Sequence, residues 1–383
     1  MSQKQFLFIL AVGTVISFGV VFASGPYAPQ PIAPEERLHV AFIENDYGAN
    51  VSRVKYGIWD GMTLPARFQT IDADSRLYQV SDSALDTALS LDGNHHMAYL
   101  KNGAVKYRNS FSAETAPIQA SAGGANGLAL DLNSRGEPVL VFVGRDNNLY
   151  LLRRSSGIWV RSNPLLTLPL VADSRIAFAV NQATGNYHIF YTHRVGANQT
   201  DLREFIITPA FTIAGNNLVK PSLDPLAVFN FKNFQSDTAG TYEDFADIYL
   251  VDSSPVWTPR LLGQSSGFSD FDSIGLPLTW VAASDLNTTN LNVFYSFDRV
   301  NWATSTVITT PMPVWYPSID FSPNSGILGV GYSYTRQIFG QPLQEIGVAY
   351  SKLGVPPFDW KSGILVRSSV TTIQFASLKL EVE

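Results

Sequence analysis

Histidines are the side chains of this sequence best suited to proton transfer or metal binding, because imidazole titrates near neutral pH and ligates metals. Three of the five occupy one position of a recurring pattern, at the start of a strand-like segment: His39, His96 and His188. A recurring position favours a recurring structural role, here a hydrogen bond to a neighbouring turn. Metal binding or catalysis is the alternative. The remaining two histidines are His95 and His193.

Acidic residues recur in the same way. They follow the first strand of several predicted repeats, as Asp92, Asp131, Asp320 and Glu381. We expect them to cap turns. The alternative is that several converge at one mouth of a channel and hold a cation such as Ca²⁺ through oxygen ligands. Apart from that alternative, the sequence predicts no metal and no cofactor.

Two further patterns could indicate chemistry. Residues 263–267 (GQSSG) match G-x-S-x-G, but that motif needs a strand–turn–helix elbow, and we expect an inter-repeat linker there without a helix. A polar insertion at 234–247 is predicted to be a solvated acidic loop rather than a metal site. Its acids are Asp237, Glu243, Asp244 and Asp247.

Glycoside hydrolysis would need two carboxylates about 5–10 Å apart. Recognition of an acidic sugar would also need guanidinium groups, which bind carboxylates in a bidentate manner. Four arginines in separate segments could supply them: Arg175, Arg194, Arg260 and Arg336. These arginines are spread over different predicted repeats and could converge at one site, which spacing along the chain does not show.

The composition of the chain restricts the kind of fold that can hold these residues in place. The chain has 383 residues, of which 12% are aromatic and 15% charged, with 28 Gly and 22 Pro, and this combination favours short strands joined by tight turns. The absence of Cys excludes disulfides, thiolate metal sites and thiol nucleophiles. A net charge of −6 provides no basic face for nucleic acid, so we expect no nucleic-acid partner.

The N-terminus is predicted to direct export. Residues 6–23 form an uninterrupted apolar run that ends in Val-Phe-Ala, the small-residue pattern of a signal-peptidase site. Residues 1–23 are therefore a cleaved signal peptide, or an uncleaved anchor that would be the only membrane contact. Both interpretations place the remainder outside the cytoplasm, as a secreted, periplasmic or cell-surface protein. Residues 24–36 are a Pro-rich linker.

The segment 37–383 is predicted to be one all-β domain built from repeats. Strand-like segments recur with starts near 88, 128, 176, 222, 272 and 318, a spacing of roughly 40–50 residues that is typical of four-stranded propeller blades. The first repeat lacks a leading strand at Arg37, and the last ten residues resemble a leading strand alone. Joined, the two ends complete a seventh blade, so the N- and C-terminal strands are expected to pair and close the ring.

The repeat is seen most clearly in 88–109, where Leu-Asp, His-x-Ala-Tyr and x-Lys-Tyr follow one another. This pattern resembles secreted bacterial seven-bladed β-propellers of the broad sialidase-like (BNR/Asp-box) repeat group. Ser296-Phe-Asp298-Arg-Val-Asn-Trp302 is similar to the Asp box, although Arg299 replaces the usual Gly. The resemblance implies that Asp298 and Trp302 knit a turn between two outer strands, away from any active face.

Two functions are consistent with these features. An exported propeller that binds a glycan or protein is favoured over a carbohydrate-active enzyme, a sialidase-like hydrolase or lyase with its site at the channel mouth. The Arg-Ile-Pro signature of sialidases is absent, which argues against the enzyme without excluding it. The loops between second and third strands vary most, as recognition loops do on a rigid scaffold. Their candidate ligand-binding residues are Asp46, Tyr47, Arg145, His193, Arg194, Tyr334 and Arg336.

Overall fold

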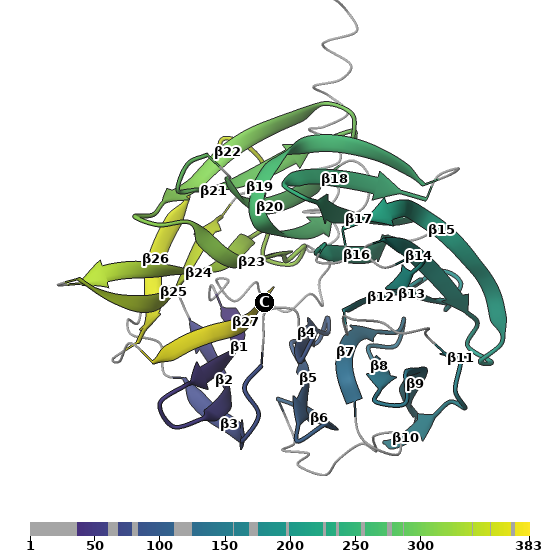
Figure 1. Ribbon diagram of the computed structural model, residues 1–383. Coiled ribbons are helices and arrows are strands. Elements are labelled where there is room, and N and C mark those ends of the chain that lie inside the picture. Colours follow the sequence, from purple (N-terminus) through teal and green to yellow (C-terminus); the bar gives the residue numbers. More distant parts are fainter. Residues whose placement is uncertain are drawn as a thin grey trace, which may run out of the picture. The chain divides into compact units, whose positions relative to one another are not determined.

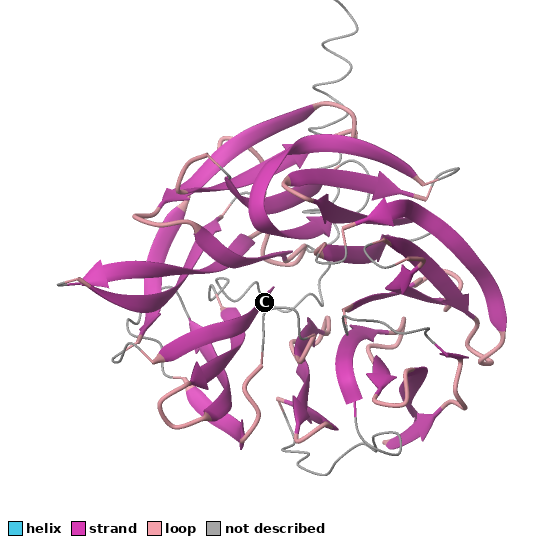
Figure 2. Ribbon diagram, in the orientation of Figure 1, coloured by secondary structure: helices cyan, strands magenta, loops and turns pink. Residues whose placement is uncertain are grey.

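In the computed structural model, the described residues form β-strands joined by turns and loops (Figure 1, Figure 2). It describes residues 37–59, 68–78, 83–110, 125–155, 157–167, 175–196, 199–224, 227–234, 237–253, 257–273, 278–285, 287–338, 340–352, 354–368 and 372–383. Over these residues no helix is long and apolar enough to cross a membrane. The predicted signal or anchor (1–23) and linker (24–36) lie outside them.

The first sheet joins the two ends of the described chain. Its strands are, in order, β27 (Ile373–Val382), β1 (Leu38–Asp46), β2 (Val51–Trp59) and β3 (Gln69–Asp74). β1 and β27 are antiparallel, with Leu38 opposite Val382 and Asp46 opposite Ile373. The prediction that the last strand pairs with the first is therefore confirmed.

Three more sheets follow in chain order (Figure 1). The second contains β4 (Leu85–Leu89), β5 (His95–Lys101) and β6 (Ala104–Asn109). The third contains β7 (Ala125–Leu132), β8 (Pro138–Gly144), β9 (Asn148–Ser155) and β10 (Ile158–Arg161), with β11 (Leu166–Thr167) beside β9. The fourth contains β12 (Ile176–Val180), β13 (Tyr187–Arg194), β14 (Thr200–Ile207) and β15 (Ile213–Leu223).

A seven-stranded sheet comes next, followed by another four-stranded one. The first contains β16 (Phe229–Phe234), β17 (Asp237–Asp244), β18 (Asp247–Asp252), β19 (Thr258–Ser273), β20 (Thr279–Asp285), β21 (Asn290–Ser296) and β22 (Trp302–Thr309). The last contains β23 (Val314–Phe321), β24 (Leu328–Ile338), β25 (Gln341–Ser351) and β26 (Lys361–Arg367).

The 16-residue strand β19 has two partners in succession. Its residues up to Gln264 pair with β18, and those from Ser265 onward pair with β20. β19 is thus the last strand of the group β16–β19 and the first strand of the group β19–β22.

Two predictions about this region were wrong. The polar insertion at 234–247 is mostly strand β17, whose Tyr242 and Glu243 are buried, and the start expected near 222 falls in β15. The pattern did not reveal the strand, because its polar residues Thr238, Thr241 and Glu243 are buried rather than exposed to solvent. The starts expected near 88, 128, 176, 272 and 318 all fall within leading strands: β4, β7, β12, β19 and β23.

The leading strands contact one another in chain order. β4 contacts β7, β7 contacts β12, and β12 contacts β16. The series continues from β16 to β19, from β19 to β23 and from β23 to β27, and β27 in turn contacts β4 (Figure 1).

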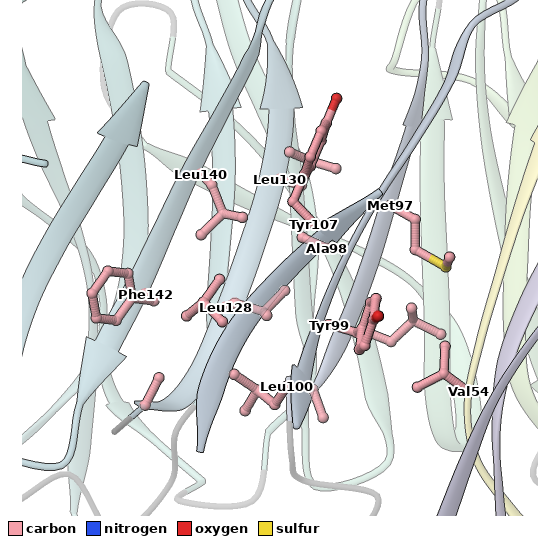
Figure 3. Close-up of a cluster of buried hydrophobic side chains, with 14 of the residues drawn as sticks. Val54, Met97, Ala98, Tyr99, Leu100, Tyr107, Leu128, Leu130, Leu140 and Phe142 are labelled. Carbon is pink, nitrogen blue, oxygen red and sulfur yellow. The ribbon is translucent and has the colours of Figure 1, made fainter. Parts of the chain in front are cut away.

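Apolar side chains fill the spaces between successive sheets. The second strand of a sheet is buried along most of its length, as in β8, where every residue is buried. Figure 3 shows one such cluster, in which Val54 of the first sheet, Tyr99 of the second and Leu128 and Phe142 of the third belong to one buried core. Face-to-face packing of this kind is the main stabilising contribution available to a chain without disulfides.

Two glycines allow β27 to approach the preceding sheet closely. A Cβ atom at Gly329 of β24 would lie 2.7 Å from Val382 Cγ2, and one at Gly331 would lie 3.1 Å from Leu378 Cδ2. The Leu-Gly-Val-Gly-Tyr sequence of β24 therefore leaves room for the apolar side chains of the C-terminal strand.

The predicted Asp-box turn connects β21 to β22. Asp298 accepts hydrogen bonds from Ser296 Oγ at 3.0 Å, from the amides of Val300 and Asn301 at 2.8 and 2.7 Å, and from Asn301 Nδ2 at 2.7 Å. Arg299 takes the glycine position with φ of +57°, and its buried guanidinium donates to Thr279 Oγ1 at 3.2 Å. The side chain thus gains contacts that a glycine would lack, which accounts for the departure from the motif.

Candidate functional site

Among the leading strands, the described residues line an open cavity of about 880 Å³. Its apolar wall includes Leu130, Ile176 and Phe178. Polar side chains from several sheets complete it, so the cavity is a shared surface rather than a feature of one sheet. They are Asp86, Thr87, Asp131, Asn230, Lys232, Asp270, Ser318, Asp320, Lys379 and Glu381.

Carboxylates of the cavity wall bind the backbone of the next leading strand. Asp86 of β4 accepts from the Leu130 amide of β7 at 2.8 Å. Asp131 of β7 accepts from the Val180 amide of β12 at 2.7 Å. These acids join sheets that share no ladder hydrogen bonds.

The same arrangement recurs on the other side of the cavity. Asp270 and Asp272 of β19 accept from the amides of Ile319 and Phe321 of β23, at 2.9 and 2.7 Å. Glu381 of β27 accepts from Thr87 Oγ1 of β4 at 2.9 Å. Asp320 of β23 accepts from the Val382 amide of β27 at 2.8 Å. The expectation that Asp131, Asp320 and Glu381 cap turns was wrong, because their carboxylates reach across to a neighbouring sheet.

Asp92 behaves differently, although it shares their position in the sequence pattern. It lies in the exposed β4–β5 turn and accepts from Ser90 Oγ and from the Asn94 amide, the latter at 3.2 Å. These bonds lower its pKa. Asp92 therefore has the predicted capping role.

Two lysines carry positive charge into the cavity. Lys232 Nζ lies 2.9 Å from Asp272 Oδ1 and 3.5 Å from Asp320 Oδ1. Lys379 Nζ lies 2.9 Å from Asp86 Oδ1. Lys232 and Asp272 belong to one seven-stranded sheet, whereas the Lys232–Asp320 and Lys379–Asp86 pairs join different sheets.

Burial raises the pKa of three cavity acids. It raises the pKa of Asp131 to about 6, and that of Asp320 to about 7 despite the opposing effect of Lys232. It raises the pKa of Glu381 well above the usual range, and the nearby Asp320 charge adds to this effect. Desolvation opposes the charge of Lys232, but Asp272 and Asp320 outweigh it and raise the pKa of the lysine. At neutral pH the cavity can therefore offer protonated carboxyls as donors beside ionised acceptors.

Turns between first and second strands form one end of the cavity. They contribute Ser90, Asn94, Asn133, Arg135 and Gln182. The Arg135 side chain is 72% exposed and lies 2.7 Å from Glu137, which makes it accessible to a ligand.

The seven predicted ligand-binding residues do not line this cavity. They lie in or beside connections between second and third strands, and antiparallel strands place those connections at the opposite ends of the sheets from the Ser90 and Arg135 turns. Tyr47 is exposed in the β1–β2 turn, where Asp46 accepts from the Ala49 amide at 3.0 Å. Arg145 lies in the β8–β9 turn, close to Gly103 of the neighbouring sheet.

The other four predicted residues belong to strands or strand ends. His193 and Arg194 close β13, and Arg194 Nε donates to the Gly196 carbonyl at 3.1 Å. Tyr334 and Arg336 lie within β24 rather than in a loop. Tyr334 is buried and donates to the fully buried Glu345, which Arg336 approaches at 3.8 Å. Tyr334 thus has a structural partner and little exposed surface.

The repeated histidines form repeated hydrogen bonds to side chains of the adjacent strand, and His96 also contacts a turn, with Nε2 3.2 Å from Asn94 Nδ2. His39 Nδ1 lies 2.7 Å from Tyr56 Oη, and His96 Nδ1 lies 2.6 Å from Tyr107 Oη. His188 Nδ1 lies 2.7 Å from Glu204 Oε1. The His and Tyr of the sequence repeat are therefore hydrogen-bonding partners.

The remaining motifs do not assemble into a second site. Ser265 of G-x-S-x-G is buried within strand β19, not in a linker or an elbow. Glu243 is buried on β17, where burial raises its pKa to about 7, so the solvated loop expected there was wrong. The four arginines contact separate partners: Arg175 the Ala227 carbonyl, Arg194 that of Gly196, Arg260 that of Arg299, and Arg336 the Glu345 carboxylate.

A metal site does not emerge from the described part of the chain, where no three His, Cys, Asp or Glu residues are grouped closely enough to hold an ion. Five charged residues of the cavity were missed: Arg135, which lies in a turn, and four on leading strands, Asp86, Lys232, Asp270 and Lys379. The signal of those four was a charged residue alternating with apolar ones on a leading strand, as in Leu378-Lys379-Leu380-Glu381. That alternation normally indicates a solvent-facing side, and here the polar side faces the cavity.

Known structures share this fold at low identity. A variant of Aleuria aurantia lectin in complex with Fucα1-6GlcNAc aligns with a TM-score of 0.50 and 11% identity, over 75% of this chain and 96% of the lectin. A variant of AofleA from Arthrobotrys oligospora aligns with a TM-score of 0.50 and 11% identity, over 80% and 91%. Another structure of the A. aurantia lectin, described as a six-bladed β-propeller, gives 0.49 and 11%, over 75% and 96%.

The sequence matches no family model and no curated protein. The two alignments with a TM-score of 0.50 therefore carry the classification, and at this identity they show the fold alone: a β-propeller.

Proposed function

We propose that this protein is an exported seven-bladed β-propeller that binds a glycan in the cavity among its leading strands. The observation that carries the proposal is the cavity itself, whose volume of about 880 Å³ lies within the roughly 300–1,000 Å³ typical of ligand sites. Its wall combines apolar side chains with carboxyl, amide and ammonium groups, which suit the apolar faces and hydroxyl groups of a sugar.

The blade count rests on β19. Taken as the outer strand of one blade and the leading strand of the next, it divides the seven-stranded sheet into two. The contacts that run from β4 through β7, β12, β16, β19 and β23 to β27 and back to β4 support a closed ring of seven.

Lectin neighbours support the glycan as ligand class only through the shared fold. The A. aurantia lectin variant is in complex with a fucosylated sugar, Fucα1-6GlcNAc, and we propose a glycan of unspecified sequence for this chain. A protein ligand is the alternative partner. Export, with residues 1–23 as signal or anchor, remains part of the proposal, and fractionation that finds the full chain in the cytoplasm would overturn it.

A glycan array probed with residues 24–383 tests the binding proposal. Once a glycan is found, Arg135→Ala should weaken its binding at least about tenfold, because Arg135 is exposed at the cavity end. Arg336→Ala is the matched control, since it removes a half-exposed arginine at the opposite end of a sheet. Loss of binding in Arg336→Ala with normal binding in Arg135→Ala would move the site to the other end of the sheets, where the sequence had placed it.

Glycoside hydrolysis is the second candidate function, and one observation favours it. Asp320 and Glu381 line the cavity with raised pKa values, and a carboxyl that keeps its proton at neutral pH can act as a general acid. Both groups also bind neighbouring strands, through the Val382 amide and Thr87 Oγ1, which favours the structural role. Release of reducing sugar from an array-positive glycan, abolished in Glu381→Gln, would establish the enzyme.

A further inference from the structure

Three aromatic rings stack where the first sheet meets the second. His95 of β5 lies on His39 of β1, with ring centroids 5.1 Å apart and planes inclined by 12°. The same His95 ring lies 4.8 Å from Tyr56 of β2, inclined by 25°. His39 and Tyr56 belong to the sheet β27-β1-β2-β3, whereas His95 belongs to β4-β5-β6. The stack is therefore a contact between sheets that share no ladder hydrogen bonds.

Within this stack, the surroundings of His95 are the least suited to a proton. Its residue is 3% exposed, and its Nε2 atom has no hydrogen-bond partner among the described residues. His39, by contrast, contacts Tyr56 Oη at 2.7 Å and Glu383 Oε2 at 3.4 Å. A proton on His95 would place a positive charge in a buried position without an acceptor, which is costly in free energy.

The charged and titratable groups around the stack offer His95 no compensation. Burial lowers its pKa well below the usual value, and His39 and His96 lower it further. Glu383 faces His39 and Tyr56, with Arg37 beside His39 and Arg108 beside Tyr56. Asp92 and Arg154 act on His96.

Another buried histidine, His188, has the acidic partner that His95 lacks among the described residues. His188 Nδ1 lies 2.7 Å from the buried carboxylate of Glu204, so a proton on that ring meets a negative charge. His188 and His95 are both buried on second strands, but of the two only His188 has an acidic partner at hydrogen-bond distance within the described chain.

We propose that the stack of His39, His95 and Tyr56 is an acid-sensitive seam, at which proton uptake by His95 opens the contact between the first and second sheets. A charged His95 repels the adjacent His39 ring and is solvated better by water than in its buried position. Both effects favour separation of the first and second sheets. Two further contacts cross the same boundary, the Thr87–Glu381 hydrogen bond and the Lys379–Asp86 ion pair, and both line the cavity. Opening of the seam would therefore loosen one wall of the cavity.

The direction of the pH effect follows from the lowered pKa. A histidine whose folded-state pKa lies below its unfolded value contributes stability above about pH 6.5, and that contribution is lost as the pH falls. The seam should be closed at pH 7.5 and should open more often near pH 5, without any ligand present.

Hydrogen exchange of the full chain, read by mass spectrometry at pH 7.5 and 5.0 and corrected for intrinsic rates, tests the seam directly. We expect amides of β4 and β5 to lose about tenfold in protection at pH 5.0 relative to those of β20 and β24. His95→Phe, which keeps an aromatic ring but cannot take a proton, should abolish this loss. His95→Gln provides a second uncharged variant if the larger ring disturbs packing, and His188→Gln should behave as the wild type does.

Equal protection of β4 and β5 at both pH values in the wild type would overturn the proposal. A loss of protection in His95→Phe and His95→Gln as large as in the wild type would overturn it equally. Because no glycan enters the experiment, its outcome is independent of the proposed binding function.

Discussion

The amide of Val382 donates a hydrogen bond of 2.8 Å to Asp320 Oδ2, and this bond fixes the C-terminal strand to the leading strand of the preceding sheet. Asp320 also lies 3.5 Å from Lys232 Nζ, so one carboxyl connects three sheets. Removal of the carboxyl would leave the buried Val382 amide without its acceptor and would also remove the contact with Lys232.

We therefore expect Asp320→Ala to lower the free energy of unfolding by about 3 kcal/mol. Asp92→Ala is the matched control, because Asp92 occupies a related repeat position but only caps an exposed turn. Urea denaturation of the two variants provides the comparison. Similar losses in both would contradict a special role for the carboxyls that join sheets.

Deletion of residues 374–383 should destabilise the protein by several kcal/mol and promote aggregation. The deletion removes most of β27 and exposes the edge of β1, and an unpaired edge is a template for pairing with another chain. Thermal unfolding and light scattering measure the two effects. A truncated protein that melts as the full chain does would show that the β1–β27 ladder contributes little.

Gly329→Val should destabilise the protein by about 1–3 kcal/mol, because any Cβ at this position would lie 2.7 Å from Val382 Cγ2. The clash falls on the C-terminal strand, so the loss should be smaller in the background of the 374–383 deletion. Gly196→Val is the control, since the nearest atom to its Cβ is Gln199 Cβ at 3.7 Å. If the stability losses of Gly329→Val and of the 374–383 deletion are additive when the two changes are combined, the clash does not involve the C-terminal strand.

The raised pKa of Asp131 predicts a pH-dependent difference between the wild type and Asp131→Asn. A carboxyl with a folded-state pKa of about 6, above its unfolded value of about 3.9, stabilises the fold most at low pH and loses that contribution as the pH rises through 6. The Tm of the wild type minus that of the variant should therefore fall between pH 5 and pH 8. Asp92→Asn, which removes a carboxyl with a lowered pKa, should give a constant difference over this range.

Tyr334→Phe should lower the free energy of unfolding by about 1 kcal/mol, because it removes the hydroxyl that donates to buried Glu345. Arg336→Ala, two residues along β24, should have a smaller effect, since that side chain is 48% exposed and Arg367 also contacts Glu345. Calorimetry of both variants distinguishes the structural residue from the surface residue. A larger loss for Arg336→Ala would reverse the assignment.

Much of the fold followed from local patterns. Period-2 alternation and turn residues predicted the strands, and the missing partner at Arg37 correctly predicted that Leu38–Asp46 pairs with the end of the chain. The Asp box was found because its hydrogen bonds are all local. β17 was missed because Thr238, Thr241 and Glu243 are buried, and burial of polar side chains depends on neighbouring strands that a local sequence pattern does not reveal.

The candidate site was harder to predict, and for a related reason. Lys232 and Asp320 are 88 positions apart in the sequence, and each resembles a surface residue of an alternating strand. Only the arrangement of the leading strands turns those polar sides toward a common cavity. Tyr334 was chosen as an exposed aromatic, but the length of β24 places it opposite Val314 and beside Glu345.

The pairing of β1 with β27 also has a consequence during synthesis. β1 leaves the ribosome roughly 300 residues ahead of its partner, a delay on the order of 15–60 s at about 5–20 residues per second. Through that interval β2 can cover one side of β1 while the other side stays open to any strand nearby. Because the native partner is so distant, the yield of folded protein should depend on how long a nascent chain can be kept from its neighbours, and slower translation would extend the period of exposure.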